Sequence, residues 1–174
     1  MPIEIVEAVS NEDYAAFGEL VVVYEAWLQA RYATVPDLIN EVREHQNLDA
    51  ELADLRHKYG PPQGVALLAR LEGVLAGGVA YRDLGDGSCE MKRLYVLDSA
   101  QGAGVGRALC EELIGRATSA GFTSMRLDTG FLNSEAMALY AELGFAPCGP
   151  YSEYPPRIAE HLRFFERSLH RDEM

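Results

Sequence analysis

The pattern of apolar and polar positions in the first third of the chain is typical of helices. After a short strand-like segment at residues 3–6, either Ser10 or Asn11 can cap a helix that is expected to end near residue 31. A second expected helix, rich in charge, covers residues 36–57 and stops before a Pro-Pro pair. This part of the chain therefore predicts one strand followed by two helices.

After these helices the pattern changes to that of strands, and strands then alternate with helices. Residues 64–70 and 74–82 are apolar and flank a glycine-containing turn, which predicts a hairpin. The elements expected after it are a strand at residues 89–97, a helix at 104–120, a strand at 124–128, a helix at 134–143, and strands at 145–149 and 161–169. Because a helix connects the strands at 89–97 and 124–128, these two can be parallel. The order predicts an α/β (α+β) fold, in which helices cover the faces of a mixed sheet.

Length and composition favour a single domain over residues 1–174. No apolar run is long enough to span a bilayer, and the first ten residues lack the basic and apolar regions of a signal peptide. We therefore expect a cytoplasmic protein with no membrane partner. The formal net charge of −12 argues against nucleic acid as a partner. The same charge either attracts a cationic ligand, such as a polyamine or a lysine side chain, or only keeps the protein soluble.

Neither the cysteines nor the histidines follow a metal-binding pattern. Cys89, Cys110 and Cys148 are an odd number of widely spaced cysteines without a CxxC pair, and the four histidines form no HExxH motif. We expect reduced, mostly apolar cysteines and no metal site.

The segment with the most chemical information is a strand that leads into a glycine-rich turn at residues 101–107. Glycine lets the backbone curl with its N–H groups pointing inward, and the start of the next helix adds free N–H groups with partial positive charge. Such a turn can hold a pyrophosphate, to which Arg107 could add a charge-assisted contact. A P-loop would need Lys and then Ser or Thr after Gly106, but Arg107 and Ala108 stand there. The spacing also departs from the GxGxxG fingerprint of dinucleotide-binding folds.

Two motifs in this half of the chain resemble a known family. The glycine-rich turn, Gln101-x-x-Gly104-x-Gly106, is similar to the Q/R-x-x-G-x-G/A motif of the GNAT superfamily of acyl-CoA-dependent N-acyltransferases. The family's later helix, which flanks the coenzyme A arm, is similar to Asn133-x-x-Ala136-x-x-x-Tyr140 followed by Leu143-Gly144-Phe145. The resemblance is densest over residues 64–145. It implies a mostly antiparallel sheet with a splayed parallel strand pair that holds the cofactor.

The resemblance also implies acetyl-CoA as cosubstrate and a role for each motif residue. The pyrophosphate would be held by backbone N–H groups of Gln101, Gly102, Ala103, Gly104, Val105, Gly106 and Arg107. The backbone of Leu94, Tyr95 and Val96 would pair with the pantetheine arm as an added strand and orient the thioester carbonyl. Asn133 would contact the same arm, and Tyr140 would point its hydroxyl at the thioester sulfur.

The reaction that the resemblance implies needs a neutral amine. At pH 7 a lysine-like amine is protonated, and the neutral form costs roughly 4–5 kcal/mol. Glu90 is the candidate general base, because it matches the position of the glutamate of many family members and strand alternation places it on the face of Leu94 and Val96. The alternative is a solvated glutamate paired with Lys92 or Arg93. Tyr140 is the candidate general acid for the departing thiolate, and the alternative is a core tyrosine.

The acceptor remains open, as do the other classes of function. The helices within residues 11–57 and the loop at residues 151–157 are expected to shape the acceptor pocket, in which Tyr151 and Tyr154 either stack on a substrate or only pack the loop. Small amines, amino acids and peptides all fit as acceptors, and a homodimer is compatible with the sequence. A non-catalytic acyl-CoA sensor or partner subunit is the main alternative. An NAD-dependent oxidoreductase would use Asp128 as its acidic residue, but its fingerprint is broken.

Overall fold

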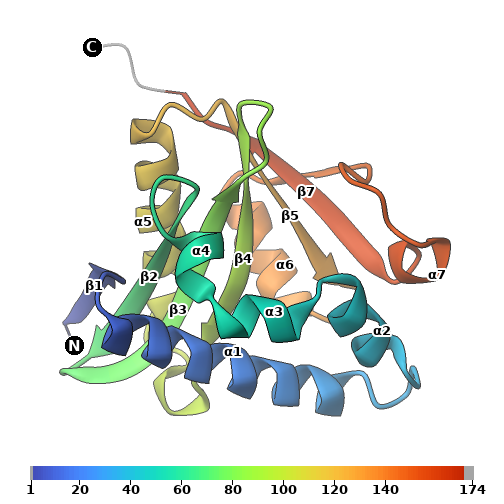
Figure 1. The fold of residues 1–174 in the computed structure, drawn as a ribbon, viewed down its shortest axis with the longest axis horizontal. Coiled ribbons are helices and arrows are strands. Elements are labelled where there is room, and N and C mark those ends of the chain that lie inside the picture. The colour runs from blue at the N-terminus through green and yellow to red at the C-terminus, as the bar shows by residue number, and fades with distance from the viewer. Residues whose placement is uncertain (1, 171–174) are drawn as a thin grey trace.

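A computed structural model describes residues 2–170 of the chain. The expected domain at residues 1–174 extends beyond this range at both ends. The elements are β1 (Ile3–Glu7), α1 (Asn11–Arg31), α2 (Leu38–His45), α3 (Leu48–Ala53), α4 (Leu55–Tyr59), β2 (Gly64–Leu71), β3 (Val74–Asp83), β4 (Ser88–Val96), a 3₁₀ turn (Asp98–Ala100), α5 (Val105–Ser119), β5 (Ser124–Gly130), α6 (Ser134–Glu142), β6 (Ala146–Cys148), α7 (Pro156–Ala159) and β7 (Leu162–Ser168). Figure 1 shows how they surround one sheet.

The strands of the described residues form one sheet in the order β1-β2-β3-β4-β5-β7-β6. All neighbours are antiparallel except β4 and β5, which confirms the parallel pair expected from the helical connection. β4 and β5 are paired only at their first residues, the last pair being Glu90 with Arg126. Beyond that pair the two strands diverge, so the splayed strand pair that the resemblance implied is confirmed.

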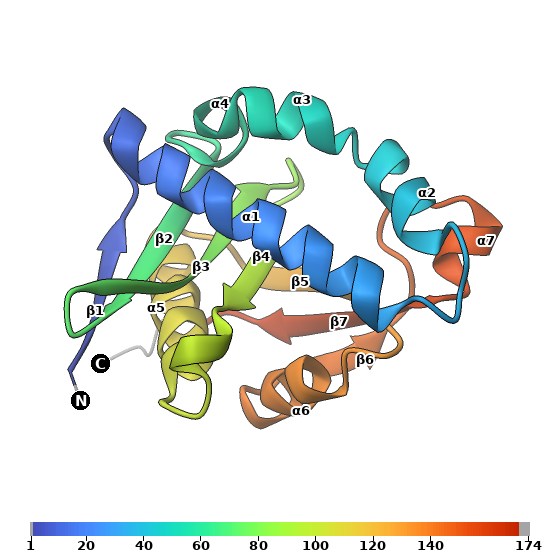
Figure 2. The ribbon, with the colours of Figure 1, turned by 90° about the horizontal axis from the view of Figure 1, so that it is seen from below.

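Helices cover both faces of the sheet (Figure 2). On one face, α1 and the short helices after it pack Phe17, Leu20 and Tyr59 against apolar residues of β2 and β3. On the other face, α5 buries Leu109 and Leu113 against β2, β3 and β4. The splay between β4 and β5 is therefore flanked by α1 on one side and by the start of α5 and α6 on the other.

The expected helix at residues 36–57 is wrong as a single element, because the chain forms α2, α3 and α4 there. Asn47 has a φ of 52°, in the left-handed region that asparagine tolerates better than most residues. Asp54 has a φ of −149°, and its side chain accepts a hydrogen bond from the His57 N–H at 3.1 Å, which caps α4. Two residues whose side chains suit caps therefore divide a segment that is helix-like in composition.

The expected shared face of Glu90, Leu94 and Val96 is also wrong. β4 contains a β-bulge, because it advances by three residues from Lys92 to Tyr95 while its partner β3 advances by only two, from Ala80 to Gly78. Arg93, within the bulge, has a φ of 62°. The extra residue moves the later side chains to the opposite face. Leu94 and Val96 consequently pack with the α5 side of the core, whereas Glu90 lies on the α1 side.

Candidate functional site

The glycine-rich turn ends in a row of unpaired backbone donors. Gly102 and Gly104 have φ values of 80° and 84°, and Gly104 is the N-cap of α5. Among the hydrogen bonds of the described residues, none uses a backbone N–H of residues 102–107 as donor. Gln101 differs from the expectation, because its N–H is used within the turn and bonds to the Asp98 carbonyl at 3.3 Å. The curl therefore offers the N–H groups of residues 102–107 to an anion.

A groove of about 430 Å³ runs from this turn along the open edge of β4 toward α6. Its walls include the expected residues Leu94, Tyr95, Val96, Gly102, Gly104, Val105, Gly106, Arg107, Asn133 and Tyr140. A Cβ added at Gly106 would lie 3.6 Å from both Val96 and Leu139, so the loop lies close to the apolar walls. Arg107 is ion-paired with Glu142 and Glu111, which engages its guanidinium. The shape and the unpaired donors fit a ligand with a diphosphate at one end and an extended arm.

Tyr140 stands where this groove meets a second, smaller cavity. Its ring packs edge-on against Phe145, with centroids 5.8 Å apart, and the side chain is buried. None of the described residues forms a hydrogen bond with its hydroxyl. Burial raises the pKa of Tyr140 well above its usual value, and the nearby Cys110 adds to this effect. The hydroxyl is therefore protonated and free to donate.

The second cavity, of about 80 Å³, is called the inner pocket here. It lies in the splay between β4 and β5 and is lined by Tyr24, Glu25, Leu28, Tyr32, Leu38, Ile39, Val42, Gln46, residues 91–94, residues 128–130, Asn133, Tyr140, His161 and Leu162. It shares Tyr24, Leu94, Asn133 and Tyr140 with the groove. The two spaces therefore meet at Tyr140, with α1 and α2 forming the outer wall of the inner pocket.

Asn133 is held by its neighbours in this shared wall. Its Oδ1 accepts a hydrogen bond from the Tyr32 hydroxyl at 2.8 Å, and its Nδ2 donates to Thr129 Oγ1 at 3.0 Å. The side chain is 3% exposed. These bonds fix the start of α6 against α1 and β5, and thereby the position of Tyr140 on that helix.

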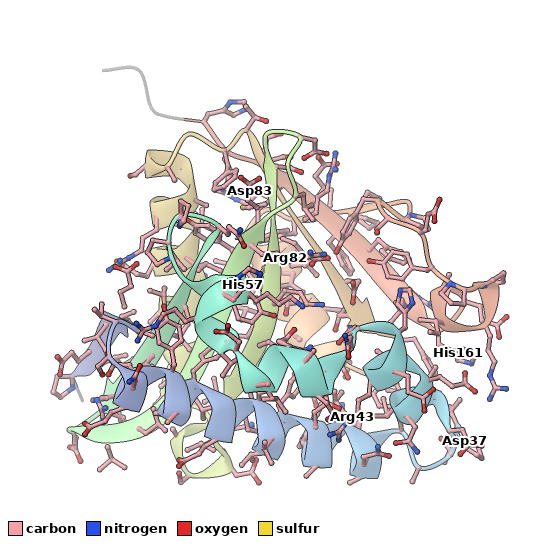
Figure 3. All side chains as sticks on the ribbon, viewed as in Figure 1. Asp37, Arg43, His57, Arg82, Asp83 and His161 are labelled. Carbon is pink, nitrogen blue, oxygen red and sulfur yellow. The ribbon has the colours of Figure 1, made fainter. Side chains whose placement is uncertain are left out.

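Glu90 does not line either cavity. It is 2% exposed, and its carboxylate accepts hydrogen bonds from Arg82 Nε at 2.8 Å and from the Tyr151 hydroxyl at 2.6 Å. Burial by itself would raise the pKa of Glu90, but the charges of Lys92 and Arg82 and the bond from Tyr151 outweigh it, so the pKa is lowered. Glu90 is thus an ionised, buried group whose ion-pair partner is Arg82 rather than Lys92 or Arg93. Figure 3 shows Arg82 near the middle of the sheet and His161 beside α7.

The carboxylate that reaches the inner pocket from this side is Asp128. Its Oδ2 accepts hydrogen bonds from the hydroxyls of Tyr154 at 2.9 Å and Tyr151 at 3.4 Å. Tyr151 therefore bridges Glu90 and Asp128. Both tyrosines of the 151–157 loop are engaged with carboxylates and each packs edge-on against Phe164.

A buried ionic network closes the pocket on the α1 side. Arg93 Nε lies 2.8 Å from Glu51 Oε2 and Arg93 Nη1 lies 3.5 Å from Glu25 Oε1, while Lys58 pairs with Glu51. Burial raises the pKa of Glu25, and the Arg93 charge only partly offsets that rise. No sequence pattern marks Glu25, Lys92 or Asp128 as pocket residues, because only the strand register, the bulge and the packing of α1 bring them together.

The fold is that of the GNAT N-acetyltransferases. The chain belongs to the acetyltransferase (GNAT) family, whose sequence pattern matches residues 13–145, and this confirms the resemblance. It is 44% identical over 120 residues to an uncharacterized N-acetyltransferase of Schizosaccharomyces pombe, covering 68% of this chain and 74% of that protein. It is 37% identical over 91 residues to an IAA acetyltransferase of Azospirillum brasilense, covering 52% of this chain and 60% of that protein.

Solved structures support the fold. An acetyltransferase from Streptococcus agalactiae superposes with a TM-score of 0.72 at 20% identity, covering 96% of this chain and 98% of that one. A PaiA N-acetyltransferase from Thermoplasma acidophilum, solved in complex with coenzyme A, gives 0.68 at 21% identity and covers 97% and 99%. In the part of the chain that the structure describes, no helix has the length and apolar character to cross a membrane.

Proposed function

We propose that the chain transfers an acetyl group from acetyl-CoA to a primary amine by direct attack in a ternary complex. The observation that carries this proposal is the row of unpaired N–H groups at residues 102–107, set at the mouth of a groove that ends at Tyr140. Family membership supports the chemistry, and the coenzyme A complex of a structural neighbour supports the ligand. Acetyl-CoA supplies an activated acetyl thioester.

The residues that would hold this cosubstrate are the N–H donors of the turn and the open edge of β4. Residues 94–96 of β4 have no pairing with β5, so the backbone groups on that edge lack a strand partner. An extended arm with amide groups can bond to such an edge as an added strand. Asn133 forms the facing wall, although its side chain is occupied by Tyr32 and Thr129.

The reaction also needs a proton donor for the sulfur and a proton acceptor for the amine. The new N–C bond forms as the C–S bond breaks, and in the net exchange the nitrogen loses a proton while the sulfur gains one. We assign the donor role to the Tyr140 hydroxyl, which is protonated and unbonded at the junction of the two cavities. We assign the acceptor role to Asp128, whose carboxylate lines the inner pocket at the β4–β5 splay, whereas Glu25, the other carboxylate in the lining, faces Arg93 on the α1 side.

Glu90, the base expected from the sequence, then acts as a positioning residue. Its carboxylate accepts a hydrogen bond from the Tyr151 hydroxyl at 2.6 Å, and the same hydroxyl lies 3.4 Å from Asp128 Oδ2. Removing the Glu90 charge would release Tyr151 and disturb Asp128 without removing a group from the pocket.

A thiol-release assay tests the proposal. The purified chain, acetyl-CoA and a panel of small amines, amino acids and peptides should release coenzyme A only when a suitable amine is present, and the acetylated amine should be detectable by mass. Coenzyme A should also bind in calorimetry. Binding without release on any amine of the panel would indicate the non-catalytic acyl-CoA sensor, and the absence of binding would exclude both.

A further inference from the structure

Two opposite charges face each other across the splay between β4 and β5. The last paired residues of these strands are Glu90 and Arg126, and the next positions on the same face are Lys92 and Asp128. Both line the inner pocket. They do not form an ion pair with each other, because the strands diverge at this point.

Each of the two groups has unused bonding capacity. No hydrogen bond or ion pair of the described residues involves the Lys92 ammonium, which is half-buried on β4. Asp128 receives both tyrosine hydroxyls on Oδ2, and its Oδ1 accepts no bond from any described residue. Within the described residues, the two strands at the splay therefore present the Lys92 ammonium and Asp128 Oδ1 to the pocket, neither of them with a hydrogen-bond partner.

The other charged groups around the pocket are already compensated. Glu25 faces Arg93, whose guanidinium also bonds to Glu51 and Gln46. Glu90, behind Asp128, is paired with Arg82, and the nearby Lys92 charge also lowers its pKa without forming an ion pair or hydrogen bond with it. His161 Nδ1 lies 2.8 Å from the Arg157 carbonyl. Lys92 and Asp128 consequently decide what charge pattern a ligand must bring.

We propose that the acceptor is an amine that also carries a carboxylate, as in a free amino acid, with its amine at Asp128 and its carboxylate at Lys92. This inference rests on the proposed function. Leu38, Ile39, Val42 and Leu162 give the same pocket an apolar wall for a side chain. A simple amine or an amino-acid amide would leave the Lys92 ammonium without its anion, and a site built for a polar group discriminates against ligands that lack it.

Matched acceptors test the inference. With acetyl-CoA held at saturation, leucine should give at least a tenfold higher kcat/KM than leucinamide or 3-methylbutylamine, and alanine should exceed alaninamide likewise. Lys92→Gln should remove this preference by raising the KM for the amino acid, with the KM for acetyl-CoA unchanged. Lys92→Arg should restore most of the preference. Arg70→Gln, which removes a positive charge from β2 outside the inner pocket, should leave it intact.

The outcomes separate this inference from the proposed function. Equal rates on the amino acid, its amide and its decarboxylated amine would overturn the inference while the acetyl transfer stands. A preference retained in Lys92→Gln would overturn the role of Lys92. The absence of thiol release on every amine would overturn the proposed function itself. The wild-type comparison is decisive even if a Lys92 variant fails to fold.

Discussion

At the scale of single residues, the Tyr140 hydroxyl is the group best placed to meet a leaving sulfur. It is buried, protonated and unbonded within the described residues, and its helix is fixed by the bonds of Asn133. Tyr140→Phe should lower kcat by about 10²–10⁴-fold, the usual worth of a positioned proton donor, with little change in the KM for acetyl-CoA. Steady-state kinetics measures both constants.

Tyr95 offers the matched control, since it lines the same groove and its ring packs at a tilt against both Tyr24 and Trp27 of α1. Tyr95→Phe removes a hydroxyl from the same wall and should leave kcat within about threefold of the wild type. A similar loss in both variants, or none in Tyr140→Phe, would remove the donor role from Tyr140.

The roles of Asp128 and Glu90 are distinguished by how the rate loss of their variants depends on pH. Asp128→Asn should lower the rate by about 10²-fold or more near neutral pH, because the variant cannot take the proton of the amine. The loss should shrink as the pH rises, since more of the amine is then neutral without help. Rate profiles from pH 6 to 10 measure this trend.

Glu90→Gln is the comparison variant. As a positioning residue whose folded-state pKa is lowered, Glu90 is ionised throughout that range, so its replacement should give a smaller loss that is the same at each pH. The reverse pattern, with the pH-dependent loss in Glu90→Gln, would restore the direct base role expected from the sequence.

At the scale of elements, the turn before α5 depends on left-handed glycines. Gly104 has a φ of 84°, where a β-branched side chain is strained, and its carbonyl closes the first turn of α5. Gly104→Val should reorient the N–H donors and raise the KM for acetyl-CoA about tenfold, the equivalent of one charge-assisted hydrogen bond of about 1.5 kcal/mol. Gly85→Val, at the same φ of 84° in the β3–β4 turn, should be strained alike but leave that KM unchanged.

The short helix α3 is held against β4 by an ion pair between Glu51 and Arg93. Glu51 is buried, and the charges of Arg93 and Lys58 outweigh the effect of burial and lower its pKa to about 2. Glu51→Gln leaves Arg93 with an incomplete set of partners and should destabilise the fold by about 3 kcal/mol in denaturant unfolding. Glu41→Gln, which loses only an exposed pair with Arg157, should cost at most about 0.5 kcal/mol.

The stabilisation of the fold by the Glu51 carboxylate should decrease as the pH falls. Because the folded pKa of Glu51 lies below the unfolded one, its contribution is present above about pH 4.5 and is lost as the pH falls toward 2. The wild type should therefore lose more stability than Glu51→Gln over that interval. Parallel losses in both would show that the Glu51 carboxylate does not carry the effect.

Most elements could be predicted because their signals are local. Ser10 caps α1 with a capping box to Asp13, Gly144 ends α6 in the left-handed region, and two apolar runs around a glycine-containing turn mark the hairpin. The division of residues 36–57 was not predicted although its signals, Asn47 and Asp54, are local. The bulge at Arg93 could not be predicted, because it trades local regularity for contacts made elsewhere. Arg93, for example, turns toward Glu51 and Glu25, which are far away in the sequence.

At the scale of the whole molecule, half of the candidate site has a sequence signal. The glycine loop and Tyr140 belong to motifs with fixed spacing, and the structure brings both to one groove. Lys92 and Asp128 have no such signal, because their opposition depends on the register of a parallel pair and on where that pair opens. Glu90 had a signal, but Arg82 and Tyr151 occupy its carboxylate.

Because coenzyme A would contact several elements of the folded chain at once, it should stabilise the whole fold. The walls of the groove come from β4, the turn before α5, and α6. A ligand that binds only the folded state at 100 times its dissociation constant adds about 2.7 kcal/mol. For a chain of this size that corresponds to a rise in Tm of about 5–10 °C in thermal melting. Gly104→Val should show a smaller rise at the same concentration and Gly85→Val the full rise, so equal shifts in the two variants would place the bound ligand elsewhere.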